Sequence, residues 1–132
     1  MGNVRHRWTT RRATTPGVGI SDFKALIFEV LLTAGLVSTI LGTASGARNI
    51  GSNGALAVGG YIALAGLWAA PISGASMNPV RSFAPDLVRG DVSTTWIYIA
   101  GPIIGAIIAV AFEWILNGKP TAAGASAAQG SL

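Results

Sequence analysis

The chain has 132 residues, of which 51% are hydrophobic and only 11% are charged. Soluble domains carry about 25% charged residues, so this deficit, together with apolar runs near span length, favours an integral membrane protein. The absence of cysteine excludes disulfides and thiolate metal sites. The net charge of +4 comes from basic residues clustered at the N-terminus, and no nucleic-acid-binding fold accompanies it, so we expect no nucleic-acid partner.

Residues 1–13 form a basic tail that contains four arginines, Arg5, Arg7, Arg11 and Arg12. No apolar segment follows directly, so the tail is not a secretory signal peptide. We expect it to be solvated; an anchor for anionic lipid headgroups is the alternative. The next segment, TTPGVGISD, predicts a loop, after which Ser21 or Asp22 can cap a helix.

Residues 23–43 form the first predicted span, which is apolar except for Lys24 at its mouth and Glu29 inside it. A carboxylate within a span is costly, so it normally faces a partner. The backbone N–H groups of an irregular loop near residues 73–77 need acceptors, and we expect Glu29 to accept from them. A proton-relay role for Glu29 is the alternative.

Residues 50–70 form the second predicted span, after a polar, glycine-rich connection. Small residues recur in it at four-residue spacing, at Ala55, Gly59 and Ala63. Such a stripe lets helices approach closely in lipid, so we expect it to pack tightly. Pro71 should end this span, because a proline deep in a helix removes a hydrogen bond and clashes with the preceding turn.

A shorter helix is predicted at residues 78–88, because Asn78 is a strong N-cap residue and Pro79 suits the first helical position. It covers only about 16 Å, roughly half of a bilayer core. A half-length helix between full spans is typical of a re-entrant element, whose irregular backbone is buried in protein or lines a water-filled cavity. Pro85 should shorten or kink it.

Arg81 falls in the first turn of this half-helix. An arginine inside a membrane needs a function or a pairing, and it keeps its charge at any ordinary pH. At a pore wall it would repel cations and donate to a polar solute; a purely structural ion pair is the alternative. Farther along, we expect three ordinary charges near the surface, Asp86, Arg89 and Asp91.

Residues 96–116 form the third predicted span, flanked by Trp96 and Trp114 as interfacial aromatics. It contains a second small-residue stripe, and Glu113 near its far end can reach the headgroups. The members of that stripe are Gly101, Gly105 and Ala109. Residues 117–132 are a low-complexity Ala/Gly/Ser tail that we expect to be disordered.

The segment GASMNPVRSF resembles the second Asn-Pro-Ala loop of the aquaporin or major intrinsic protein family, with Val80 where the motif usually has Ala. The resemblance covers residues 14–116 and only the second of the family's two inverted repeats. It implies an all-α membrane protein with three transmembrane helices plus one re-entrant half-helix, forming half of a channel domain.

The resemblance also implies passive passage of water, and of small uncharged solutes such as glycerol, with no enzymatic chemistry, cofactor or metal. It implies that Asn78 donates its amide to solute oxygen and that Glu29 and Pro79 brace the loop. Water-selective members of the family resemble one another in carrying a histidine at the position of Gly66, and Ala75 matches a second position of the family's pore constriction. Both residues are small, so the resemblance implies a wide constriction, called the filter below. The pore-contacting residues implied are Gly66, Ala75, Ser76, Met77, Asn78 and Arg81.

The cues for the solute conflict. Ser82 and Tyr98 are the residue types that water channels of the family carry at these positions. Gly66 and Ile99 resemble the residues of the branch that conducts larger solutes. Water and glycerol therefore both remain open as substrates at the level of sequence.

The family pore lies between two repeats, so we expect a truncated or partial channel chain that needs a first repeat or a full-length homologue. The complete assembly implied is a tetramer in the plasma membrane. The alternatives are a non-conducting membrane fragment or assembly partner that lacks the first repeat, and a channel built from two copies of a half-size chain.

The orientation of the lone chain is ambiguous. The family layout puts the loop before the first span outside and Arg48 in a cytoplasmic connection. Four arginines precede the first span and Lys24 lies at its start, however, and the positive-inside rule then puts the N-terminus in the cytoplasm. We therefore expect the isolated chain to insert inverted or in both orientations.

Overall fold

The computed structural model describes residues 14–44 and 51–119, and all regular structure in these two ranges is helical. The helices are α2 (Asp22–Ala44), α3 (Gly51–Ser73), α4 (Pro79–Arg89) and α5 (Thr95–Asn117). Three of them, α2, α3 and α5, are long and apolar enough to cross a membrane. The predicted all-α membrane fold with one half-length helix is confirmed.

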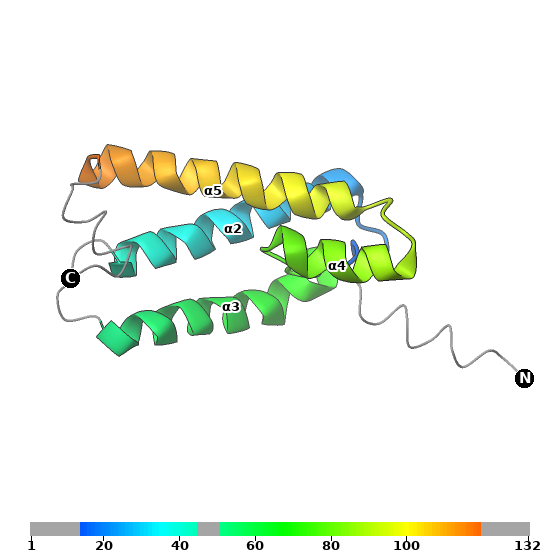
Figure 1. Cartoon of the computed structure of the whole chain (residues 1–132), viewed down its shortest axis with the longest axis horizontal. Helices are drawn as coiled ribbons and strands as arrows, with labels where there is room; N and C mark the ends of the chain where they lie inside the picture. The colour runs from blue at the N-terminus through cyan, green and yellow to red at the C-terminus, as the bar shows by residue number, and fades with distance from the viewer. Residues whose placement is uncertain (1–13, 45–50, 120–132) are drawn as a thin grey trace, which may run out of the picture.

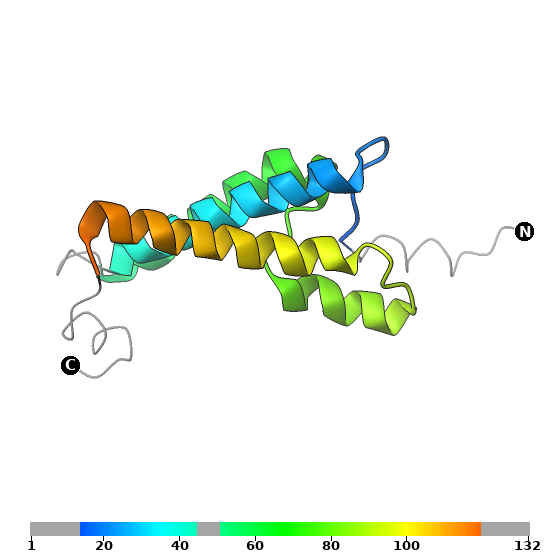
Figure 2. The same cartoon turned by 90° about the horizontal axis from the view of Figure 1, so that it is seen from above.

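Helix α4 occupies only one half of the length of the bundle. Its N-terminus lies about midway along α3 and α5, and its C-terminus lies at the end of the bundle where α2 begins (Figure 1). Seen from above, α4 runs beside the first half of α5, on the side away from α2 (Figure 2). The start of α4 therefore lies at mid-depth of the apolar spans.

Glycines allow α2 and α5 to pack closely. A Cβ atom added at Gly101 would lie 2.7 Å from the Cβ of Glu29. One added at Gly105 would overlap the carbonyl oxygen of Val30 and lie 3.0 Å from the amide nitrogen of Ala34. The close packing expected from the stripe in α5 is therefore present.

The small-residue stripe of α3 is uncovered within the described residues. Ala55, Gly59 and Ala63 are exposed, and a Cβ added at Gly59 would meet no atom within 4 Å. Helix α3 instead turns Ala65 and Ala69 towards α2, where both are buried in one apolar cluster with Leu32. The hydroxyl of Tyr61 also donates to the Leu32 carbonyl over 2.9 Å. Within the described residues a different face of α3 contacts α2, so close packing of this stripe stays a prediction for protein outside them.

Two prolines lie inside helices that were expected to end or weaken at them. Helix α3 continues past Pro71 to Ser73, so the prediction that Pro71 ends the span is wrong. A proline this near the C-terminal end removes one hydrogen bond, and the helix instead ends where Gly74 adopts a φ of 86°. Helix α4 likewise runs through Pro85 to Arg89, so Pro85 does not shorten it.

The expectation that Asp86 is a surface charge is also wrong. Its side chain is fully buried, and its carboxylate accepts hydrogen bonds from Thr95 and Arg89. Arg89 lies three residues later on the same helix, and Thr95 comes into range because the chain folds back from α4 into α5. Asp91 is exposed as expected, and hydrogen bonds from the Ser93 hydroxyl and amide lower the pKa of Asp91.

The orientation prediction is testable because the chain has no cysteine. The end of α2, the start of α3 and the end of α5 lie at the same end of the bundle (Figure 1). The variants Ser52→Cys and Ser126→Cys, the second outside the described residues, should therefore label from one side in any single molecule. With an impermeant reagent on intact cells, we expect labelling from outside in all or part of the population. Labelling from the cytoplasmic side alone at both positions would show that the charge argument fails.

Candidate functional site

Asn78 caps the start of α4. Its Oδ1 atom accepts from the backbone N–H of Val80 over 2.9 Å and from that of Arg81 over 3.4 Å. The backbone at Asn78 is extended, with φ −152°, and Pro79 occupies the start of the helix, as the sequence predicts. Because Oδ1 faces the helix end, the planar amide directs Nδ2 away from it, where this nitrogen can donate to another group.

The loop before Asn78 has an unusual backbone. Gly74 has a φ of 86°, and the non-glycine residues Ala75 and Met77 have φ values of 47° and 53°. Left-handed conformations of this kind cost about 1–3 kcal/mol each in non-glycine residues and persist only where surrounding contacts fix them. The loop therefore requires specific partners.

Glu29 of α2 supplies those partners. Its side chain is fully buried, and its Oε1 accepts from the Ser73 hydroxyl over 2.7 Å and from the Ser76 amide over 3.0 Å. Its Oε2 accepts from the Met77 amide over 2.8 Å. The hydrogen bonds expected between Glu29 and the backbone of this loop are present. Tyr98 of α5 adds a further contact by donating to the Ser73 carbonyl over 2.7 Å.

Ser76 and Ser82 join the loop to α4. Their hydroxyl oxygens are 2.7 Å apart, and the Ser76 hydroxyl lies 2.9 Å from the Asn78 carbonyl, to which it donates. A serine hydroxyl has one proton, so Ser82 is the donor to Ser76. Sequence reasoning used Ser82 only as a resemblance to water channels and missed this contact.

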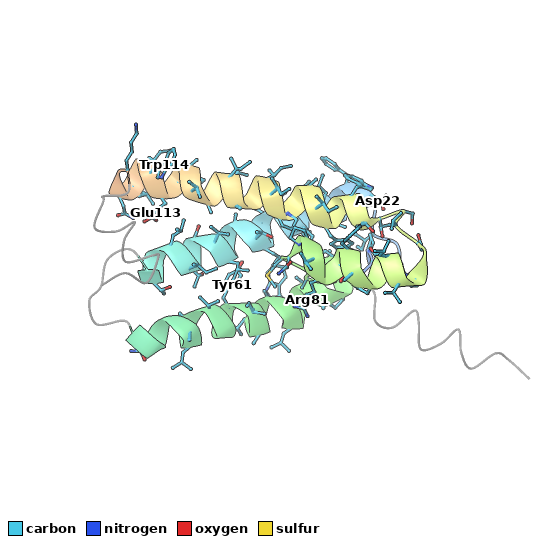
Figure 3. The ribbon with its side chains drawn as sticks, viewed as in Figure 1. Asp22, Tyr61, Arg81, Glu113 and Trp114 are labelled. Carbon is cyan, nitrogen blue, oxygen red and sulfur yellow. The ribbon has the colours of Figure 1, made fainter. Side chains whose placement is uncertain are left out.

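A cavity of about 130 Å³ lies where this loop meets α2, α3 and the start of α4. Its lining residues are Leu36, Ile62, Ser76, Met77, Asn78 and Arg81. Leu36 and Ile62 give it an apolar side, whereas Ser76, Asn78 and Arg81 give it a polar side. Arg81 lies in the first turn of α4, near α3 (Figure 3).

The structure brings together four of the six residues that the resemblance implies for the pore. The other two lie elsewhere: Ala75 is buried in the apolar cluster with Leu32, and Gly66 is not among the lining residues. A Cβ at Gly66 would meet no atom within 4 Å, so a larger side chain there has space. Sequence reasoning missed Leu36 and Ile62, because apolar residues in apolar spans carry no distinguishing signal.

Positive charge dominates the polar side of the cavity. Arg81 and Asn78 are both exposed, and no carboxylate in the described part of the chain pairs with Arg81. The start of α4 adds the positive end of the helix dipole. A purely structural ion pair for Arg81 therefore has no partner within residues 14–44 and 51–119.

Comparisons with known proteins agree with this geometry. The family model for major intrinsic proteins matches residues 4–112. Aquaporin NIP1-1 of Oryza sativa subsp. japonica is 42% identical over 118 residues, which cover 88% of this chain and 40% of the relative. Aquaporin NIP1-1 of Zea mays is 44% identical over 97 residues, which cover 74% of this chain and 33% of the relative.

A third relative comes from another named group. Probable aquaporin TIP2-2 of Oryza sativa subsp. japonica is 38% identical over 113 residues, covering 83% of this chain and 46% of the relative. The chain thus spans less than half the length of these curated relatives. The match to the family model covers most of the sequence, including the capped half-helix and the loop that Glu29 binds. The chain belongs to the major intrinsic protein family.

Proposed function

We propose that this chain forms one wall of a membrane channel that passes water and small uncharged solutes such as glycerol. The observation that carries the proposal is a cavity lined by the exposed residues Asn78 and Arg81, where residues 14–44 and 51–119 offer the Arg81 guanidinium no carboxylate partner. Both residues lie at the start of α4, at mid-depth of the apolar spans. Polar and charged groups at that depth are stable where they meet protein or a water-filled path, not lipid.

The proposed wall selects by charge and by hydrogen bonding. Arg81 and the positive end of α4 repel cations, including protons. The Nδ2 of Asn78 donates to the oxygen of a passing solute, while Leu36 and Ile62 line the same cavity with apolar side chains that offer no competing hydrogen bonds. This combination suits a small neutral molecule that carries an accepting oxygen.

The opposite wall comes from protein outside the described residues. A first repeat, a full-length homologue or a second copy of this chain can each supply it, within a tetramer in the cell membrane. Grafting residues 14–116 into rice aquaporin NIP1-1, in place of its matched segment, provides a covalent version of the complete pore.

Stopped-flow light scattering on liposomes tests the proposal. Liposomes that contain the graft should pass water and at least one of glycerol and urea faster than empty liposomes do. Liposomes with the 132-residue chain alone show whether it conducts without another partner. A graft that inserts and folds but leaves permeability at the level of empty liposomes would contradict the channel function.

A wide filter makes Gly66 a sensitive position. The substitution Gly66→His in the graft should reduce glycerol and urea passage while water passage remains, because the imidazole enters open space and adds bulk and a hydrogen-bonding group. Gly59→His is the matched control, since it makes the same change at a glycine that also meets open space, seven residues or about 10 Å nearer the start of the same helix. Strict exclusion of glycerol and urea by the unsubstituted graft would count against the wide filter.

A further inference from the structure

Polar contacts hold α4 against the rest of the bundle. Its buried residues, Ser82 and Asp86, lie one turn apart on the same face. Its large apolar residues point outward: Val80 is 69% exposed, Leu87 61% and Val88 90%. In lipid, apolar side chains gain little by turning towards protein, so the polar contacts determine how this helix sits.

One contact of Asp86 connects α4 to α5, and its other contacts lie within α4 and the turn that follows it. One carboxylate oxygen accepts from the hydroxyl of Thr95, the first residue of α5, and the other accepts from the Arg89 guanidinium over 3.3 Å. The backbone carbonyl of Asp86 accepts from the amide of Asp91 over 3.2 Å. Thr95 is 3% exposed and Asp86 is fully buried, so water does not replace these bonds easily.

Arg89 completes the cluster. Its guanidinium lies 3.3 Å from the Asp86 carboxylate and 3.5 Å from that of Asp91, so the buried charge is paired. Removing one member of a buried, paired cluster leaves the other groups without partners. The C-terminal end of α4 is therefore fixed by one well-defined set of contacts.

We propose that Asp86 is a positioning residue for the pore. Through its bond to Thr95 of α5 it fixes the rotation and depth of α4, and thereby the place of Arg81 at the cavity. The Ser76–Ser82 contact holds the other end of the helix, so α4 has a polar tether at each end. Loss of the Asp86 tether lets α4 pivot. The constriction then widens and admits larger solutes, while water still passes. This role rests on the proposed channel function.

Thr95 offers a sharper test than Asp86 itself, because Asp86→Ala also leaves Arg89 without its main partner. Thr95→Val removes the hydroxyl and keeps the shape, whereas Thr95→Ser keeps the hydroxyl. Thr94→Val is the matched control, since the neighbouring Thr94 makes no side-chain cap bond. Two readouts apply: the glycerol-to-water permeability ratio of the graft, and the spin-label distance distribution between Val80→Cys and Ile115→Cys in the 132-residue chain.

In Thr95→Val and Asp86→Ala, the distance distribution should broaden and the permeability ratio should rise by about threefold or more, as expected for the loss of one net hydrogen bond. Thr95→Ser and Thr94→Val should match the unsubstituted protein. An unchanged distribution in Thr95→Val overturns the tether, and a broadened one with an unchanged ratio overturns the role in selectivity. If the unsubstituted graft passes no water, the channel function fails and so does that selectivity role, while the distance distributions still decide whether Asp86 tethers α4.

Discussion

Replacing Glu29 with alanine should lower the free energy of unfolding by roughly 1–3 kcal/mol for the groups left unpaired. The Ser73 hydroxyl and the Ser76 and Met77 amides would all lose their acceptor at residues that are buried in the fold. Denaturant unfolding of the purified chain in detergent, followed by circular dichroism, measures the change. We also expect the loop at residues 74–77 to lose its left-handed backbone, which amide exchange would report.

The variant Glu29→Gln separates the charge of Glu29 from its shape. A glutamine can keep one accepting oxygen for Ser73 and Ser76, but its amide nitrogen would then face the Met77 N–H, and two donors repel each other. Its stability should fall between those of the native chain and Glu29→Ala. Glu113→Gln, near the far end of α5, is the control and should change stability less than Glu29→Gln, because Glu113 is partly exposed and a glutamine keeps an oxygen that can accept from Asn117. A Glu29→Ala chain as stable as the control would refute the bracing role.

A second large effect is expected at the interface of α2 and α5. Gly105→Ala should destabilise the bundle by about 1–3 kcal/mol, because overpacking forces backbones apart. The new Cβ would overlap the carbonyl oxygen of Val30, which belongs to the backbone of α2 and has no rotamer to change. Thermal unfolding in detergent checks this result.

Gly59→Ala is the matched control for Gly105→Ala. It makes the same chemical change inside a spanning helix, but its Cβ would meet open space, so its stability should stay the same or rise slightly. If both variants melt at the same temperature as the native chain, the close approach of α2 and α5 is not a source of stability.

Local signals in the sequence predicted the centre of the site. Asn78 followed by Pro79 indicates a helix start whatever surrounds it, and a lone carboxylate such as Glu29 inside a span requires a donor. The irregular loop before Asn78 is a segment with backbone donors to spare. The cap and the hydrogen bonds from Glu29 could therefore be predicted without coordinates.

Features that depend on how helices face one another could not be predicted in this way. The spacing of Ala55, Gly59 and Ala63 shows that one face of α3 is small, but not which face contacts α2. Asp86 looked like a surface charge, because its donor Thr95 lies nine residues later and approaches only after the chain reverses direction. Periodicity identifies a helical face, and the tertiary fold determines what covers it.

Water flux through cysteine variants tests the central claim most directly, since the native chain has no cysteine for a mercurial to modify. Ile62 lines the cavity, whereas Leu67 on the same helix does not and is 78% exposed. In the graft, with the cysteines native to the rice relative removed, a mercurial should block most of the water flux of Ile62→Cys and leave that of Leu67→Cys unchanged. Equal sensitivity of the two variants, or no block of labelled Ile62→Cys, would contradict the assignment of this cavity to the water path.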